Sequence, residues 1–253
     1  MSDEAEAGQE HRRDEGQYLA NCIHRMSHYW SGPTHGSYRR RLAISYCGET
    51  PIDQLVTDVT AVLDDTPGRV VVGITGPPGA GKSTLALTLT AAFDGASYLP
   101  MDGFHLSNAA LDRLGRRDRK GAVDTFDAAG YVVALERVRS EYRRREVYVP
   151  AFDRGLDEPV AAGHVVPAES RLVITEGNYL GLPEGEWALV RELLDRLYYV
   201  DCPTEVRRER LVARHIEGGR TPRAAAAWAD EVDEPNARLI ATTRQFCDAV
   251  VTG

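Results

Sequence analysis

The sequence predicts an α/β fold in which a mainly parallel β-sheet lies between two layers of helices. Short apolar runs rich in β-branched residues occupy positions 70–74, 171–175 and 197–200, as expected for strands that are buried on both faces. Amphipathic segments of helical length separate these runs. Strands that alternate with helices in this way form a parallel sheet with helices on both faces.

Composition restricts the class of protein further. The chain has 253 residues, of which 43% are hydrophobic and 27% are charged, and its net charge is −8. These values are typical of a globular protein, and the negative balance argues against a general nucleic-acid binder. No apolar run approaches the roughly 20 residues that span a bilayer. We therefore expect neither nucleic acid nor a membrane as a partner.

The cysteines and the N-terminus indicate a cytoplasmic protein. Cys22, Cys47, Cys202 and Cys247 are far apart and form no CxxC pair, so they suggest neither a disulfide framework nor a zinc site. The first ten residues are acidic and lack the apolar core of a secretory signal. The expected assembly is a monomer or a homodimer.

Three regions are expected along the chain. Residues 1–15 carry six acids against two arginines and predict a disordered acidic tail. Residues 16–50 form an N-terminal extension, with a helix at 17–30 and a short strand at 41–46. Residues 51–253 form the main domain. Its first helix starts with Thr50 as N-cap and Pro51 at N1, and it ends at 66–68.

The other elements of the main domain follow from periodicity and from turn residues. In order, we expect a strand at 70–74, a helix at 82–93, a strand at 97–101, a helix at 128–145, a hairpin of strands at 146–149 and 160–166, a strand at 171–175, a helix at 186–195, a strand at 197–200, three helical segments in 203–247 and a strand at 249–251.

The segment after the first strand is a phosphate-binding loop. Residues 76–84 read GPPGAGKST, which fits the Walker A pattern GxxxxGK[ST] between a buried strand and a helix. Glycines let consecutive main-chain N–H groups point at phosphate oxygens, and the start of the helix adds a positive dipole. The fold is therefore predicted to be a P-loop NTPase sandwich of three α/β/α layers. Its expected nucleotide-binding residues are Gly76, Gly79, Ala80, Gly81, Lys82, Ser83 and Thr84.

Other features favour a small-molecule kinase among the P-loop classes. The chain has neither an NKxD motif to read guanine nor an LSGGQ-like transporter signature, and the strand at 171–175 ends in Glu176 rather than in an Asp-Glu pair. Asp102 follows the second strand, at the sheet edge where ligands bind. It could act as the base for an attacking hydroxyl, or it could be an exposed strand-end residue or hold a Mg²⁺-bound water.

Two further groups complete the predicted chemistry. Glu176 and Ser83 are expected to hold Mg²⁺, although Glu176 could simply close its strand. Arg207, Arg210 and Arg214 share one helical face, and the glycines at 218–219 separate that helix from the next. This arrangement predicts a helical lid at about 207–230 that closes over ATP. The alternative is a solvated basic face paired with nearby glutamates.

Seven segments, read in chain order, resemble the phosphate-loop kinases grouped with uridine kinase, phosphoribulokinase and bacterial pantothenate kinase. The nearest branch is a nucleoside/nucleotide kinase family with members labelled as fructose-transport-system kinases. The resemblance covers about residues 52–251. The segments are GPPGAGKST, MDGFHLSN, RKGAVDTFD, VPAFDR, RLVITEGNYL, RRERLVARH and DEPN.

The resemblance implies roles for individual residues. Asp102 matches the aspartate that acts as base or positions the hydroxyl, segments 124–127 and 152–154 match acceptor-contacting segments, and Arg210 and Arg214 match lid arginines. The catalytic set is therefore Lys82, Asp102, Arg210 and Arg214, and the two arginines also belong to the expected nucleotide-binding set. The candidate acceptor-binding set is Asp102, Phe104, His105, Arg117, Asp124, Phe126, Phe152, Arg154, Glu176, Asn178 and Tyr179. From the residues alone, Phe126 and Phe152 could equally be core aromatics.

A dense basic stretch at 113–120 leaves the charge of the acceptor open. It could grip a phosphate or carboxylate on the substrate, or it could be a solvated loop.

The sequence thus predicts an ATP- and Mg²⁺-dependent kinase that phosphorylates a hydroxyl of a small polar metabolite. The expected acceptor is a nucleoside or a sugar, and a pantothenate-like acceptor is the second choice. The basic stretch also allows an anionic acceptor. The alternative is a regulatory P-loop module that binds nucleotide and hydrolyses it slowly or not at all.

Overall fold

The computed structural model describes residues 51–252. The tail predicted at 1–15 and the extension predicted at 16–50, with its helix at 17–30 and strand at 41–46, lie outside the described residues.

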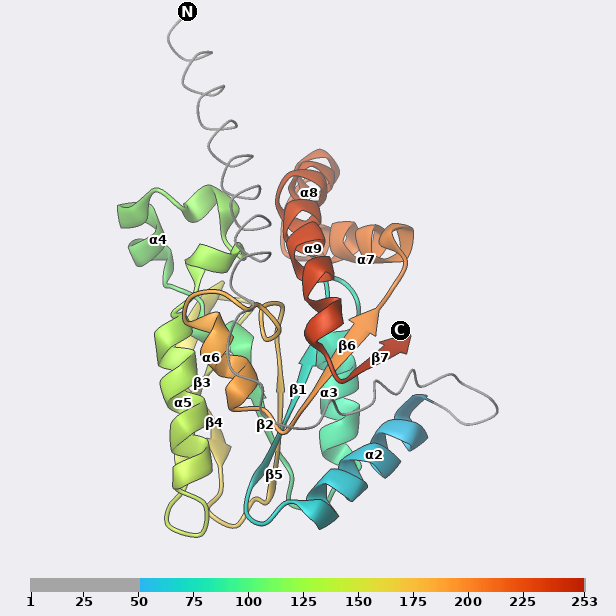
Figure 1. The fold of residues 1–253 in the computed structure, drawn as a ribbon. Helices are drawn as coiled ribbons and strands as arrows, with labels where there is room; N and C mark the ends of the chain where they lie inside the picture. The colour runs from blue at the N-terminus through green and yellow to red at the C-terminus, as the bar shows by residue number, and fades with distance from the viewer. Residues whose placement is uncertain (1–50, 253) are drawn as a thin grey trace, which may run out of the picture. The chain divides into compact units, whose positions relative to one another are not determined.

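Five parallel strands form the central sheet in the order β2-β5-β1-β6-β7 (Figure 1). Every pairing between neighbours is parallel, which confirms the predicted sheet. β1 lies in the middle and all its residues are buried, as its apolar sequence requires. The strands are β1 (Val70–Thr75), β2 (Ser97–Pro100), β5 (Leu172–Glu176), β6 (Arg196–Asp201) and β7 (Ala249–Thr252).

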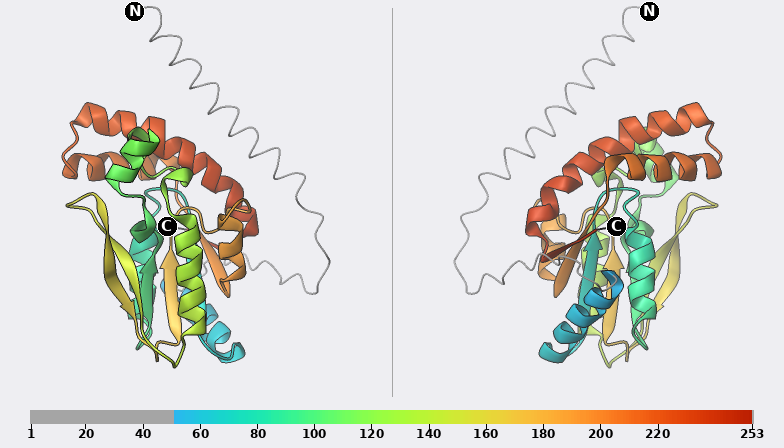
Figure 2. Two further views of the ribbon diagram at one scale, coloured as in Figure 1. Left: turned by 90° about the vertical axis from the view of Figure 1, so that its left-hand side faces the viewer. Right: turned by 90° about the vertical axis from the view of Figure 1, so that its right-hand side faces the viewer.

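Helices cover both faces of this sheet, which confirms the three-layer sandwich (Figure 2). Val70, Val72 and Ile74 of β1 belong to the core shared with α2 (Pro51–Asp65) and α3 (Lys82–Ala91). Val71 belongs to the opposite core, which is shared with α5 (Ala128–Ser140), α6 (Trp187–Glu192) and α9 (Glu234–Ala241). Successive side chains of a strand point to opposite faces, so one short strand supplies both cores.

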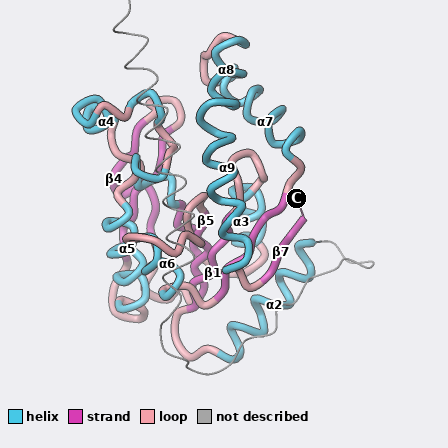
Figure 3. The backbone as a smooth tube through the Cα atoms, turned by 45° about the horizontal axis from the view of Figure 1, so that its top comes forward, coloured by secondary structure: helices cyan, strands magenta, loops and turns pink. Residues whose placement is uncertain are grey.

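The remaining elements stand mostly beyond the carboxyl ends of the strands, where the tube trace shows helices and loops around the sheet edge (Figure 3). They are the 3-10 helices η1 (Met101–Phe104), η2 (Arg117–Arg119), η3 (Val123–Thr125) and η5 (Thr242–Phe246), the helices α4 (Asn108–Leu114), α7 (Thr204–Glu217) and α8 (Pro222–Trp228), the π-helical turn η4 (Ala229–Asp233), and the antiparallel hairpin of β3 (Val147–Asp153) and β4 (Glu158–Val166). Every helix between residues 51 and 252 is too short or too polar to span a bilayer.

Most boundaries differ from the prediction by no more than three residues, and larger differences occur at three places. The helix expected at 128–145 ends at Ser140, and Arg143 takes a left-handed φ of 60° while its N–H donates to the carbonyl of Ala168 at 2.9 Å. The hairpin strands run further than expected and contain a bulge after Val149. Helix α4 was not predicted; its N-cap is Ser107, whose hydroxyl accepts from the N–H of Ala110 at 3.2 Å.

A charged cluster attaches α2 to the sheet. Asp58 on α2 accepts two hydrogen bonds from Arg196 of β6, at 2.9 and 2.7 Å, and one from the hydroxyl of Tyr198. Both charged side chains are mostly buried, with exposed fractions of 18% and 13%. Burial opposes the charged carboxylate, but the hydrogen bonds from Arg196 and Tyr198 prevail and lower the pKa of Asp58.

We expect Asp58→Asn to lower the free energy of unfolding by about 2 kcal/mol at neutral pH, because it leaves Arg196 without its charged partner. A carboxylate whose pKa is lowered in the folded state contributes stability above its unfolded pKa and loses it as pH falls through the folded pKa. The difference from the wild type should therefore persist to about pH 5 and fade below the ordinary value of 3.8. Urea unfolding at pH 7, 5 and 3.5 measures this. Asp64→Asn, at an exposed position of the same helix, is the control, and an equal loss there would contradict the assignment.

Candidate active site

The loop predicted to bind phosphate joins β1 to α3 as the motif requires. Residues 76–81 lie between the two elements, and α3 begins at Lys82. Gly81 is the N-cap and is left-handed, with a φ of 93°. The first N–H groups of α3 have no partners within the helix, so they are available to an anion at this point.

Two glycines let the loop pack directly against neighbouring main chain. A Cβ atom on Gly76 would lie 2.5 Å from the carbonyl oxygen of Val200, and one on Gly79 would lie 2.8 Å from that of Arg207. Both glycines have positive φ, at 149° and 77°. The loop is therefore held between β6 and α7 by contacts that only glycine permits.

Lys82 and Glu176 are charged groups buried beneath this loop, with exposed fractions of 8% and 3%. The ammonium group of Lys82 donates to the carbonyl of Pro77 at 3.0 Å. Burial lowers the pKa of Lys82 to about 8, although the negative charges of Glu176 and Asp102 oppose the shift. Burial and the charge of Asp102 raise the pKa of Glu176. Both charged forms are thus poorly solvated, so an anionic ligand would stabilise the ammonium group of Lys82 and a cation would stabilise the carboxylate of Glu176.

The oxygen atoms beside Glu176 fit a magnesium ion. The hydroxyl of Tyr98 donates to Glu176 Oε1 at 2.8 Å, and the nearby side chain of Ser83 acts to lower the pKa of Glu176. A hydroxyl and a carboxylate are hard oxygen ligands, and Mg²⁺ commonly takes its other ligands from water and phosphate. Tyr98 was not singled out in the sequence, because its role depends on the pairing of β2 with β5.

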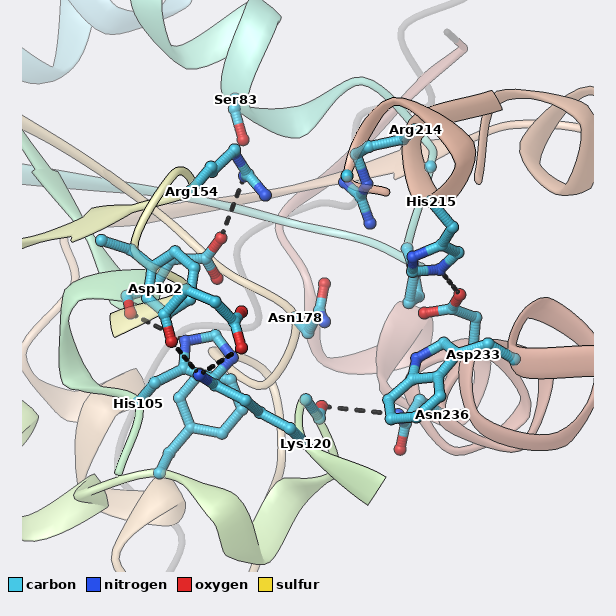
Figure 4. A pocket seen from close by; sticks show the side chains of 18 of the residues that line it. Ser83, Asp102, His105, Lys120, Arg154, Asn178, Arg214, His215, Asp233 and Asn236 are labelled. Atoms are coloured by element: carbon cyan, nitrogen blue, oxygen red, sulfur yellow. Dashed lines mark hydrogen bonds and ion pairs between the residues drawn. The ribbon is translucent and has the colours of Figure 1, made fainter. Parts of the chain in front are cut away.

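Asp102 lies at the same edge of the sheet, in η1 just after β2. Its carboxylate is 31% exposed, and Oδ2 accepts from Arg154 Nη2 at 3.4 Å. Asp102, Lys82, Ser83 and Gly79 line one cleft of about 460 Å³ (Figure 4). The carboxylate and the phosphate loop therefore border the same space.

The three arginines predicted to share a face of α7 have three different environments. Arg207 is buried, and it contacts the carbonyl of Pro78 and the carboxylate of Glu234, both at 3.4 Å. Arg210 donates to the carbonyl of Gly79 at 3.4 Å and does not line the cleft. Arg214 lines the cleft, and among the described residues no carboxylate forms an ion pair with it.

Most of the predicted acceptor-binding residues meet in this cleft, joined by residues of the lid region. His105 stacks between Phe126 and Phe152, with ring centroids 4.0 and 4.7 Å apart, and its Nδ1 donates to the carbonyl of Asp102 at 2.8 Å. Besides the loop, the lining comprises Asp102, His105, Arg117, Lys120, Gly121, Phe126, Phe152, Arg154, Asp157, Glu176, Asn178, Arg214, His215, Gly218, Gly219, Arg220, Trp228, Asp233 and Asn236.

Three predicted acceptor-binding residues lie elsewhere. Phe104 packs in the core against Tyr131, with centroids 5.1 Å apart. Tyr179 is fully buried and its hydroxyl donates to the carbonyl of Gly121 at 2.6 Å. Asp124 is held by Arg119 at 2.7 Å and by Arg116 at 3.2 Å. Five predicted nucleotide-binding residues also stand outside the cleft lining, namely Gly76, Ala80, Gly81, Thr84 and Arg210.

The basic stretch at 113–120 is largely neutralised by nearby carboxylates. Arg116 and Arg119 pair with Asp124, and Arg117 lies 3.7 Å from Asp112. Lys120 is 8% exposed, lies 3.1 Å from Asp157 and sits over the ring of Phe152. Only Arg117 and Lys120 of this stretch line the cleft, when the described residues are considered.

The lid-side wall of the cleft contains residues that the sequence did not identify. His215, Trp228, Asp233 and Asn236 come from α7, α8, η4 and α9. The segment DEPN carries the last two, three positions apart, and was noted only as part of a resemblance. The spacing of an acid and an amide on one helical face was the available signal.

Comparisons with known proteins agree with this geometry. A family model described as "Phosphoribulokinase / Uridine kinase family" matches residues 71–251. A Schizosaccharomyces pombe protein named "Putative uridine kinase C227.14" is 36% identical over 161 residues, which cover 60% of this chain and 68% of that protein. The Escherichia coli protein YggC is 36% identical over 184 residues, which cover 70% of this chain and 75% of YggC.

A solved structure shows the same fold. The crystal structure of a "putative fructose transport system kinase" from Silicibacter sp. TM1040 has a TM-score of 0.73 and 36% identity, and the match covers 80% of this chain and 99% of that one. The fold and the loop thus define a P-loop kinase. The chain belongs to the phosphoribulokinase/uridine kinase family, which confirms the predicted resemblance.

The close packing of the loop against α7 generates a prediction. Gly79→Ala should lower the melting temperature more than Gly81→Ala, because both force an alanine into a left-handed conformation but only the first clashes with main chain. At Gly81 a Cβ meets nothing closer than 3.9 Å. Thermal melts of the two variants beside the wild type measure this. Equal decreases in melting temperature would show that the packing of α7 against the loop does not contribute to stability.

Proposed function

We propose that the protein transfers the γ-phosphoryl group of ATP to a hydroxyl group of a small polar metabolite. The observation that carries this proposal is that the carboxylate of Asp102 lines the same cleft as Lys82 and Ser83 of the phosphate loop. An alcohol bound between them would have a proton acceptor on one side and the terminal phosphate on the other.

The residues of the loop supply the binding of the triphosphate. Main-chain N–H groups of the loop and of the first turn of α3 would hold the phosphate oxygens. Lys82 and Arg214 would offset the charge that develops on the transferred group, and Lys82 is already buried where that charge forms. Ser83 and Glu176 would hold a magnesium ion, which would supply positive charge to offset that of the phosphates.

Asp102 would position the hydroxyl of the acceptor and accept its proton as the new phosphate ester bond forms. In the free protein Arg154 contacts this carboxylate at 3.4 Å. Arg154 is 60% exposed, so it can move aside without leaving a buried charge unpaired. The aromatic group of His105, Phe126 and Phe152 then forms one wall of the acceptor site.

The acceptor is a nucleoside or a sugar in this proposal, with a pantothenate-like acceptor as the less favoured choice. Support comes from the aromatic wall and from the relatives whose names refer to uridine and fructose. The lid is the pair of helices α7 and α8, joined by Gly218 and Gly219. Its closure would exclude water from the phosphoryl group.

The proposal is tested by release of ADP from ATP and Mg²⁺ in the presence and absence of acceptors. The acceptor panel contains nucleosides, sugars, sugar phosphates and pantothenate. We expect release that depends on at least one acceptor. Release that is indifferent to all of them would instead support a regulatory nucleotide-binding module.

Asp102→Asn should lower kcat by about 10²- to 10⁴-fold, because the amide keeps the shape of the side chain but cannot accept the proton. The affinity for ATP, measured by calorimetry, should change by no more than a few-fold. Asp94→Asn, at an exposed position after α3, is the matched control and should retain full turnover. Survival of turnover in Asp102→Asn would remove the base from the mechanism.

A further inference from the structure

The wall of the cleft opposite Asp102 carries a second, more deeply buried carboxylate. Asp233 is 8% exposed and lines the cleft from the π-helical turn η4. Figure 4 shows Asp233 and Asp102 on opposite sides, with the side chain of Asn178 between them. Burying a carboxylate costs free energy unless the group is hydrogen-bonded, so the partners of Asp233 indicate its role.

Only part of the hydrogen-bonding capacity of Asp233 is used. Its Oδ2 lies 2.7 Å from Nε2 of His215. The ring of His215 meets Trp228 edge-on at 6.3 Å, and Arg220 stacks over Trp228 at 3.7 Å, so the histidine is itself held in place. Within residues 51–252 no other side chain donates a hydrogen bond to this carboxylate. One of its oxygens therefore remains for a ligand.

Asn236 adds a second acceptor to the same wall. It is 8% exposed, lines the cleft, and lies three residues after Asp233. Its amide nitrogen donates to the carbonyl of Gly121 at 3.4 Å, which leaves its side-chain oxygen and its second N–H for another partner. We call Asp233 and Asn236 the distal pair.

The chemistry of the distal pair selects the kind of ligand. An ionised carboxylate only accepts hydrogen bonds, whereas Asn236 offers its oxygen as an acceptor and its second N–H as a donor. A hydroxyl can satisfy both residues, because it donates and accepts. A phosphate or a carboxylate offers no donor to Asp233 and would be repelled by its charge.

Most of the cations that line the cleft already have a partner within residues 51–252. Lys120 lies 3.1 Å from Asp157, Arg117 lies 3.7 Å from Asp112, and Arg220 stacks over Trp228. Arg154 contacts Asp102 at 3.4 Å and is 60% exposed, so its charge stays in water when it moves, and Arg214 is assigned to the transferred phosphoryl group. Asp124, which the resemblance placed against the acceptor, is held by Arg116 and Arg119 outside the cleft. The buried carboxylate on the wall opposite Asp102 is instead Asp233.

We infer that the acceptor is an uncharged polyol and that Asp233, with Asn236, is a specificity-determining residue that binds a second donor group of that molecule. This inference rests on the proposed function. Asp102 binds the hydroxyl that reacts, and the distal pair binds a donor at the opposite end, so the span between the two walls selects which hydroxyl is phosphorylated. His215 fixes the orientation of Asp233.

The substrate class is tested on the unmodified protein. ADP release is measured with uncharged polyols (uridine, D-fructose and D-ribose) and with anionic acceptors (D-glycerate, pantothenate and ribulose 5-phosphate). We expect the highest kcat/KM with an uncharged compound. A higher value with an anionic acceptor would overturn this inference and leave the kinase proposal intact. Release that no acceptor stimulates would show that the proposed function itself is wrong, and this inference would fall with it.

The role of Asp233 is tested with Asp233→Asn and the analogues of the best uncharged acceptor that each lack one donor. These are the monodeoxy compounds and, for uridine, also 3-methyluridine. In the wild type, loss of the donor bound by Asp233 should lower kcat/KM by about 10- to 100-fold, the usual effect of removing a hydrogen bond to a charged group. In Asp233→Asn the kcat/KM of the same analogue should be no more than about 2- to 3-fold below that of the parent compound.

Asp230→Asn is the matched control, because Asp230 lies in the same turn but pairs with Arg208 on the surface and does not line the cleft. Asp233→Asn should raise the KM for the acceptor about tenfold or more and leave the KM for ATP unchanged, whereas Asp230→Asn should change neither. One contrary outcome is that every analogue lowers kcat/KM by the same factor in the wild type and in Asp233→Asn. Another is that the KM for ATP rises together with the KM for the acceptor. Either outcome would show that Asp233 only supports the lid and that the inference is wrong. If Asp233→Asn does not fold, the wild type alone still tests the inference. Analogues whose kcat/KM all equal that of the parent compound would overturn it.

Discussion

The buried ammonium group of Lys82 is the constraint on which the cleft depends. It lies at the start of α3 with a single main-chain hydrogen bond to Pro77, and burial lowers its pKa to about 8. Glu176 on the next strand is buried beside it, and the charge of Asp102 acts on both. The carboxyl ends of β1, β5 and β2 bring these groups together, because neighbouring parallel strands end at one edge of the sheet. The position of the site follows from the order of the strands.

The lid helix α7 contacts the phosphate loop through main-chain atoms as well as through its charged side chains. Gly79 packs against the carbonyl of Arg207, and Arg207 and Arg210 return hydrogen bonds to carbonyls of the loop. These contacts place α7 so that Arg214, one turn further along, lines the cleft. The three arginines on one helical face therefore have different environments, and of the three only Arg214 lines the cleft. Substituting any two of them should not be expected to have the same effect.

In the part of the cleft away from the phosphate loop, the pairing of charged side chains determines which of them a ligand can contact. The basic stretch at 113–120 is satisfied by Asp112, Asp124 and Asp157, so its sequence overstates the positive charge that a ligand meets. The opposite wall holds Asp233 and Asn236, which expose acceptors. A ligand with several donor groups complements this part better than an anion does. Under the proposed function, hydrogen-bonding capacity rather than net charge would select the acceptor.

The fold class, the order of the elements and the phosphate loop were readable from local patterns. Apolar β-branched runs, amphipathic spacing and GPPGAGKST are short-range features, and each is stable only in one arrangement of strand, loop and helix. The candidate site was readable only in part. Phe104 and Tyr179 stand beside cleft residues in the sequence but point into the core, and Asp124 turns to two arginines. The distal pair reaches the cleft, and Tyr98 reaches Glu176, through packing between segments far apart in the chain. Sequence alone determined which segments form the nucleotide end of the cleft, because one continuous motif builds it. Tertiary structure decided the acceptor end, because its walls come from the hairpin, the strand ends and the lid, and only their packing settles which polar atoms remain unpaired.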